Sequence, residues 1–139
     1  MNERFGNWQY PDIQEGTPTK YNWVVQHVGN FKLGYKTDIG AFCYINAKHF
    51  VTIEDCVQVG SHSSIYSVST IDNKSGPVTL KKGCRIGSHS VVMPGVTIGK
   101  NAVVGAHSFV ISDIPDNAVA YGVPAKVVRF SGHEDSSVE

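Results

Sequence analysis

Residues 86–110 read IGSHSVVMPGVTIGKNAVVGAHSFV, and an aliphatic residue returns at every sixth position of this stretch. Leu80 extends the series backwards, and two earlier stretches hold the same spacing in frames of their own. The twelve aliphatic positions are Leu33, Ile39, Ile45, Ile53, Val59, Ile65, Leu80, Ile86, Val92, Ile98, Val104 and Val110. The chain is therefore built on a repeat of six residues.

The neighbours of the aliphatic positions support the repeat independently. Glycine follows directly at six of the twelve positions, where about one would be expected from 14 glycines in 139 residues. The residues four places after the aliphatic positions are mostly small, namely Cys43, Ser63, Ser69, Cys84, Ser90, Ala102 and Ser108. An inward aliphatic, a glycine and a small residue thus recur together.

A six-residue unit is too short for a pair of helices and too regular for hairpins. Three short strands joined by tight turns make one triangular coil, and coils stack at the spacing of parallel strands, about 4.8 Å. Aliphatic residues fill the interior, and glycine relieves crowding at the bends. We predict an all-β fold, a left-handed parallel β-helix with coils at residues 33–52, 53–70, 80–97 and 98–115.

The repeat is interrupted twice. Two extra residues separate Ile45 from Ile53, and nine separate Ile65 from Leu80. Both insertions leave the prism at the same edge, and the longer one predicts a protruding loop at residues 66–79. We read this loop as part of a site, or else as a solvated excursion or a contact between subunits.

The ends of the chain do not follow the repeat. Residues 1–32 are predicted to cap or flank the first coil, and residues 33–115 to form the β-helix with its loop. Residues 116–139 are predicted to form a C-terminal cap and a tail, frayed after Ser131. The terminal segments therefore cover strand edges that the repeat leaves open.

Composition excludes several functions. The formal net charge is zero and the sequence pI is about 7.0, so we expect no nucleic-acid partner. No long apolar segment and no signal sequence is visible, so we expect a cytoplasmic protein without membrane contact. The chain has an odd number of cysteines, Cys43, Cys56 and Cys84, and they lack CxxC spacing. This pattern is typical of cysteines that pack as small apolar residues in a reducing compartment.

Three histidines share one place in the repeat. His62, His89 and His107 each follow a second-face aliphatic by three residues, so they are predicted to stack on one edge about 5 Å apart. Turn positions tolerate histidine in general. Alternatively, one of the three serves as a general base, because imidazole titrates near neutral pH.

The sequence resembles the hexapeptide-repeat acyltransferase superfamily, and within it the bacterial sugar O- and N-acetyltransferases that include the galactoside and xenobiotic enzymes. The resemblance covers residues 33–129. Residues 113–129, DIPDNAVAYGVPAKVVR, are similar to the closing motif DIPPxxVxxGxPAKxIR of that group. The resemblance implies a homotrimer with acetyl-CoA between neighbouring prisms, lined by Ser88, Gly105 and Ala106, with Lys126 and Arg129 on the CoA phosphates.

One departure from the family concerns the base. In the galactoside and xenobiotic enzymes the catalytic histidine lies in the protruding loop, whereas no histidine occurs between Ser63 and Ser88 here. This absence favours an amino-sugar acceptor, since a neutral amine needs less help than a hydroxyl. The candidates for the base are His62 first, then His89, with Asp72 in the loop and His49 at the smaller insertion.

We therefore predict an enzyme that transfers an acetyl group from acetyl-CoA to a sugar, either nucleotide-linked or a polysaccharide precursor, as in lipopolysaccharide synthesis. One alternative is a non-catalytic trimeric scaffold or binding protein. The other is a metal-dependent enzyme like the hexapeptide-repeat carbonic anhydrases. In that family a second ligand histidine follows the first by five residues, where this chain has Ser67 and Pro94, so we expect no metal.

Overall fold

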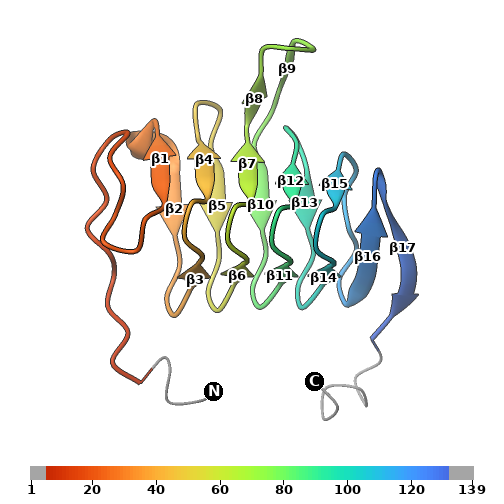
Figure 1. The fold of residues 1–139 in the computed structure, drawn as a ribbon. Helices are drawn as coiled ribbons and strands as arrows, with labels where there is room; N and C mark the ends of the chain where they lie inside the picture. The colour runs from red at the N-terminus through yellow and green to blue at the C-terminus, as the bar shows by residue number, and fades with distance from the viewer. Residues whose placement is uncertain (1–5, 132–139) are drawn as a thin grey trace.

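The computed structural model describes residues 6–131, and the predicted tail after Ser131 lies outside the described residues. The chain winds into a triangular prism with one sheet on each face, and its coils follow one another from the N-terminal to the C-terminal end (Figure 1). The prediction of a left-handed parallel β-helix is confirmed. Helical structure in the described residues is limited to the short 3₁₀ turn η2 (Val28–Asn30).

Each face is a stack of short strands from successive coils. Face 1 contains β2 (Phe31–Leu33), β5 (Val51–Ile53), β10 (Val78–Leu80) and β13 (Thr97–Ile98). Face 2 contains β3 (Asp38–Ile39), β6 (Gln58–Val59), β11 (Arg85–Ile86), β14 (Val103–Val104), β16 (Ala118–Gly122) and β17 (Ala125–Phe130). Face 3 contains β1 (Val24–Gln26), β4 (Tyr44–Asn46), β7 (Ser64–Tyr66), β12 (Val91–Val92) and β15 (Phe109–Val110).

The strand register matches the sequence repeat residue for residue. On face 1, Leu33, Ile53, Leu80 and Ile98 are successive partners. The aliphatic positions of faces 2 and 3 pair in the same way. Eleven of the twelve are buried, and Leu33 is half-buried at the N-terminal end. Each coil therefore buries its apolar residues mainly against its neighbours.

Three kinds of corner join the faces. We call the turns from face 2 to face 3 the histidine corner (residues 40–43, 60–63, 87–90 and 105–108). The turns from face 3 to face 1 are the insertion corner (residues 27–30, 47–50, 67–77 and 93–96). Both predicted insertions lie there, and the longer one carries the protruding hairpin of β8 (Val68–Ser69) and β9 (Lys74–Ser75) (Figure 1).

The solenoid begins earlier than the visible repeat. β1 pairs in parallel with β4, so a segment that was predicted only to cap or flank the first coil also adds a strand to face 3. Val25 is fully buried there, in register with Ile45. A single aliphatic position cannot be recognised as a repeat, which explains why the sequence pattern started at Leu33.

The remaining N-terminal residues are held along the first coil by specific hydrogen bonds. The Glu15 carboxylate accepts the backbone N–H groups of His27 at 2.7 Å and Val28 at 2.9 Å. These two bonds lower the pKa of Glu15. The indole N–H of Trp8 donates to the Thr37 carbonyl oxygen at 2.7 Å.

The C-terminal segment extends the prism and then closes it. β16 continues face 2 in parallel with β14, and β17 turns back antiparallel against β16. β17 thereby covers the outer edge of β16, the last parallel strand of face 2. Among residues 6–131, no helix has the length and hydropathy needed to cross a bilayer.

Candidate functional site

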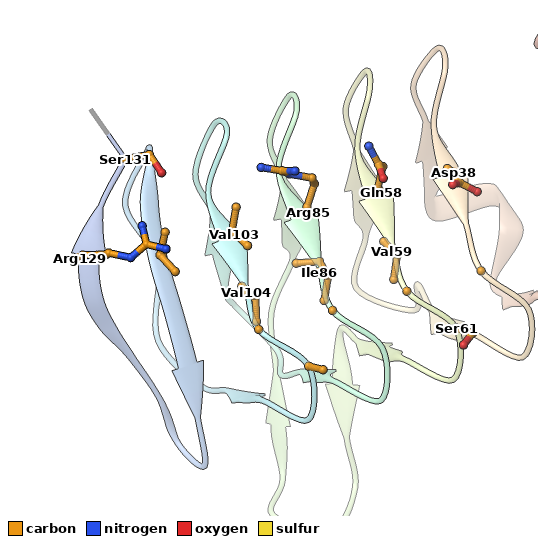
Figure 2. Close-up of a pocket in the computed structure, with 16 residues that line it drawn as sticks. Asp38, Gln58, Val59, Ser61, Arg85, Ile86, Val103, Val104, Arg129 and Ser131 are labelled. Carbon is orange, nitrogen blue, oxygen red and sulfur yellow. The ribbon is translucent and has the colours of Figure 1, made fainter. Parts of the chain in front are cut away.

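A groove of about 620 Å³ runs along the outer surface of face 2 (Figure 2). Side chains alternate across a strand, so the residue before each inward aliphatic points outward. On neighbouring strands in register, these outward residues are Asp38, Gln58, Arg85, Val103 and Val119. Arg129 of β17 adds a guanidinium at the C-terminal end. The groove therefore lies over one continuous row of side chains.

The two ends of this row differ in charge. Asp38 lies at the N-terminal end, whereas Arg85 and Arg129 lie on either side of Val103 and Val119. At about 4.8 Å per strand, the backbones of the two arginines are about 14 Å apart. An elongated ligand fits this distribution if its anionic groups lie at the C-terminal end of the groove.

Backbone from the histidine corner forms one border of the groove. Gly60, Ser61, Gly87, Gly105 and Ala106 all line it. A Cβ on Gly60 would lie 2.5 Å from the backbone nitrogen of Ser88, so only glycine lets successive coils approach this closely. Successive coils consequently pack backbone against backbone along this border.

The predicted histidine stack is observed at the same corner. The rings of His62 and His89 are 4.7 Å apart with 4° between their planes, and those of His89 and His107 are 5.0 Å apart with 7°. Phe42 continues the stack on His62, with ring centroids 5.1 Å apart. All four side chains are exposed. In the sequence, each comes directly after a turn residue that lines the groove or is next to a lining residue.

Backbone geometry explains why these side chains align. His62, His89 and His107 have φ angles of 62°, 60° and 61°, in the left-handed region. Histidine is one of the residues that tolerate this region, and the shared conformation gives each ring the same direction. Inside the corner, the hydroxyl of Ser63 donates to the Gly87 carbonyl oxygen at 3.2 Å, and Ser90 donates to Gly105 at 3.2 Å.

The structure separates the loop candidates from this stack within one chain. Asp72 lies in the hairpin at the insertion corner, where its carboxylate is 3.9 Å from the Lys74 ammonium. β7 begins at the histidine corner and ends at the insertion corner, so His62 and Asp72 lie beyond opposite ends of that strand. His49 lies at the base of the loop, where its backbone N–H donates to the Ser67 hydroxyl at 2.9 Å.

The predicted cofactor residues divide between the groove and its surroundings. Gly105, Ala106 and Arg129 line the groove. Ser88 lies in the same corner, where its backbone carbonyl oxygen accepts the backbone N–H of His107 at 2.9 Å, but it is not among the lining residues. Lys126 is exposed on β17, outside the lining of the groove, in register with Tyr121.

Sequence reasoning missed the outward row of face 2. Asp38, Gln58 and Arg85 line the groove, but none belonged to a recognised motif. Each directly precedes an aliphatic position of face 2. Projecting the repeat onto its outer surface would have placed all three on one face of the prism.

Burial of the cysteines argues against a thiol nucleophile. Burial raises the pKa of the Cys84 thiol to about 12, and it raises the pKa of Cys43 as well. Both side chains are buried, so they pack as small apolar residues. Within residues 6–131, no three His, Cys, Asp or Glu side chains are grouped so that they could hold a metal ion.

The prism, its hexapeptide register and the groove beside the corner glycines define a class of protein. The profile of the family described as "Bacterial transferase hexapeptide (six repeats)" matches residues 77–112. The chain belongs to the hexapeptide-repeat acyltransferase superfamily.

The similar proteins include sugar acetyltransferases. Galactoside O-acetyltransferase of Escherichia coli (strain K12) is 37% identical over 128 residues, with 81% of this chain and 63% of that protein covered. A hexapeptide-repeat acetyltransferase of Vibrio cholerae O1 biovar eltor, solved with acetyl coenzyme A, has a TM-score of 0.74 and 26% identity, covering 78% of this chain and 64% of that one. A galactoside acetyltransferase solved with coenzyme A has a TM-score of 0.75 and 30% identity, covering 89% and 66%. The chain spans less than two thirds of the length of each.

Proposed function

We propose that this protein transfers an acetyl group from acetyl-CoA to a hydroxyl or amino group of a sugar. The groove on face 2 carries the proposal, because it combines glycine backbone along one border with a guanidinium at its C-terminal end, and the exposed imidazole stack lies at the adjoining corner, outside the lining residues. Relatives whose names state acetyl transfer to galactosides, and similar structures solved with CoA compounds, support the same reaction.

The groove suits acetyl-CoA in a defined direction. Arg129, with Lys126 nearby on β17, would bind the phosphates at the C-terminal end. The backbone of Gly105 and Ala106 would line the pantetheine arm, and Ser88 would contribute from the same corner. The thioester would then lie toward Arg85 and Gln58, beside the imidazoles.

The chemical step needs a base and a donor for the oxyanion. The acceptor oxygen or nitrogen attacks the thioester carbonyl carbon, the C–S bond breaks, and the CoA thiolate leaves. An imidazole takes the acceptor proton and returns it to the sulfur. His62 is the first candidate because it precedes the strand that leads into the loop, and His89 is the second. A backbone N–H of the histidine corner would stabilise the oxyanion.

We infer that the active form is a homotrimer. Ile71, near the tip of the protruding hairpin, is 96% exposed, so its side chain is available for a contact with another subunit. In a trimer, the hairpin of one subunit can reach the histidine corner of the next. That arrangement would bring Asp72 to the acceptor, which it does not approach within its own chain.

The acceptor that we propose is an amino or hydroxy sugar that is nucleotide-linked or a polysaccharide precursor, as used in lipopolysaccharide synthesis. The lack of histidine in the loop supports the amine, since a neutral amine attacks without prior proton removal. Arg85 in the middle of the groove supports an acceptor with anionic groups such as a diphosphate.

The test is CoA release from acetyl-CoA across a panel of nucleotide-linked amino sugars and hydroxy sugars. We expect one class of acceptor to react, and His62→Ala or His89→Ala to lower the rate at least ~100-fold. Lys100→Ala, an exposed side chain in the turn from face 1 to face 2, serves as the control. If no acceptor reacts and calorimetry detects no acetyl-CoA binding, the chain is a non-catalytic β-helix scaffold and the proposal is wrong.

A further inference from the structure

A second hollow opens where the N-terminal segment meets the first coil. This aromatic pocket has a volume of about 310 Å³, and its walls include Trp8, Tyr21 and Trp23 together with Gln9 and Asp38. Small-molecule sites span about 300–1,000 Å³, so its size suits a single ring. Asp38 lines both the aromatic pocket and the groove on face 2, so the two are adjacent.

Two of the aromatic walls, Trp8 and Trp23, are held in place by contacts within the chain. Trp8 is held by its N–H bond to the Thr37 carbonyl and by edge contacts to Tyr10 and Tyr35, with ring centroids 4.8 and 5.4 Å apart. Trp23 is 2% exposed, whereas Tyr21 is 51% exposed at the opening. A ligand therefore meets preformed ring surfaces and loses little affinity to reorganisation of the protein.

The polar groups of the pocket restrict its ligand. A carboxylate accepts hydrogen bonds at about four lone-pair positions, so Asp38 can accept from a ligand in addition to its contacts within the chain. Gln9 offers both a donor and an acceptor. Phosphate is disfavoured by the negative charge of Asp38, and a purely apolar chain would leave these polar groups unpaired. Hydroxyl groups on a ring with an apolar face satisfy both parts of the pocket.

We propose that the aromatic pocket is a subsite for a pyranose ring, and, on the basis of the proposed function, that this ring belongs to the acceptor sugar. The C–H groups of a pyranose carry a weak positive charge and pack on the negative face of an aromatic ring. Asp38 accepts hydrogen bonds from the hydroxyls. With the CoA phosphates at Arg129, the pocket lies at the opposite end of the row, where an acceptor would approach the thioester.

The test uses the full chain and methyl β-D-galactopyranoside, with galactitol as a polyol of similar polarity that has no ring face. Binding is followed by saturation-transfer NMR, which detects dissociation constants on the order of millimolar, as expected for so small a ligand. We expect the glycoside to bind and galactitol not to bind. Tyr21→Leu and Trp8→Ala should each weaken glycoside binding at least ~10-fold, and Asp38→Asn should weaken it several-fold.

Two controls keep the result specific. Trp8→Phe retains a ring and should bind the glycoside within about threefold of wild type, and Phe50→Leu should not change binding. Tyr21 is half-exposed, so Tyr21→Leu remains informative even if Trp8→Ala unfolds the N-terminal segment. Equal binding by wild type and Tyr21→Leu, equal binding of galactitol, or no binding of the glycoside would each overturn the subsite.

Calorimetry with acetyl-CoA on the same samples separates this inference from the proposed function. A protein that binds the glycoside through Tyr21 but does not bind acetyl-CoA retains the subsite and loses the transferase. Acetyl transfer to a sugar with an unchanged KM in Tyr21→Leu retains the transferase and loses the subsite.

Discussion

The strands of face 3 begin and end at two corners that behave in opposite ways. At the histidine corner, every turn has the same length and a left-handed residue at the same position, so side chains from successive coils stack in register. At the insertion corner, the turns differ in length, and the longest carries the exposed hairpin of β8 and β9 (Figure 1). Equal turns thus make a repeated surface, and an unequal turn makes a single projection.

The largest effect is expected from a close backbone contact between coils at the histidine corner. Gly60→Ala would place a Cβ 2.5 Å from the Ser88 nitrogen, which is backbone and cannot move aside. We expect the free energy of unfolding to fall by about 3 kcal/mol, measured by urea titration. Gly29→Ala is the control, because no atom lies within 4 Å of its new Cβ. Similar stability of the two variants would contradict the close contact of the coils.

A smaller loss is expected from the serine ladder inside the same corner. The buried Ser90 hydroxyl donates to Gly105 and accepts the Ser108 N–H at 3.3 Å. Ser90→Ala removes both bonds and should lower the free energy of unfolding by about 2 kcal/mol. Ser112→Ala, at an exposed turn position, should change it by less than ~0.5 kcal/mol. A neutral Ser90→Ala would mean that the ladder does not stabilise the corner.

The insertion corner should tolerate a much larger change. Deleting residues 69–75 gives Ile65 and Leu80 the same separation as Ile45 and Ile53. We expect the free energy of unfolding to change by less than ~1 kcal/mol in a urea titration, because the hairpin adds no strand to the prism. Acetyl transfer should nevertheless fall if the hairpin reaches a neighbouring site. A loss of several kcal/mol would show that the hairpin supports the fold.

The corner between faces 1 and 2 gives the smallest effect, a chemical one. Burial raises the pKa of Cys84 to about 12, whereas the ordinary pKa of a thiol, as in the unfolded chain, is 9.0. Between these two pH values the thiol is protonated in the folded protein and ionised in the unfolded chain. Iodoacetamide at pH 8.5 should therefore label Cys84 slowly until urea is added, as measured by mass spectrometry. The same shift contributes stability below pH 9 that is lost as the pH rises toward 12. Rapid labelling of the folded protein would contradict this burial.

The sequence was most informative where each position has many copies. Twelve aliphatic residues define the prism, and the shared place of His62, His89 and His107 in the repeat predicts their stacking. Single features gave no such signal. Val25 begins the solenoid without a recognisable pattern, because one aliphatic residue has no period.

The groove was predictable only in part, for a related reason. Arg129 belongs to the closing motif, and the resemblance to the family implied Gly105 and Ala106, whereas Asp38, Gln58 and Arg85 share a position but not a residue type. The aromatic pocket depends on Trp8 and Tyr21 meeting Asp38 across a long stretch of irregular chain. Contacts of that kind are set by tertiary packing and have no local sequence pattern.

Calorimetry with acetyl-CoA on wild type and Arg129→Ala tests the central claim most directly, with Lys20→Ala as an exposed cation outside the groove. Wild type and Lys20→Ala should bind saturably with equal affinity, and Arg129→Ala should bind at least ~10-fold more weakly because a charge-assisted contact to phosphate is lost. Equal binding by all three proteins, or no binding by wild type, would contradict the assignment of the face 2 groove to acetyl-CoA.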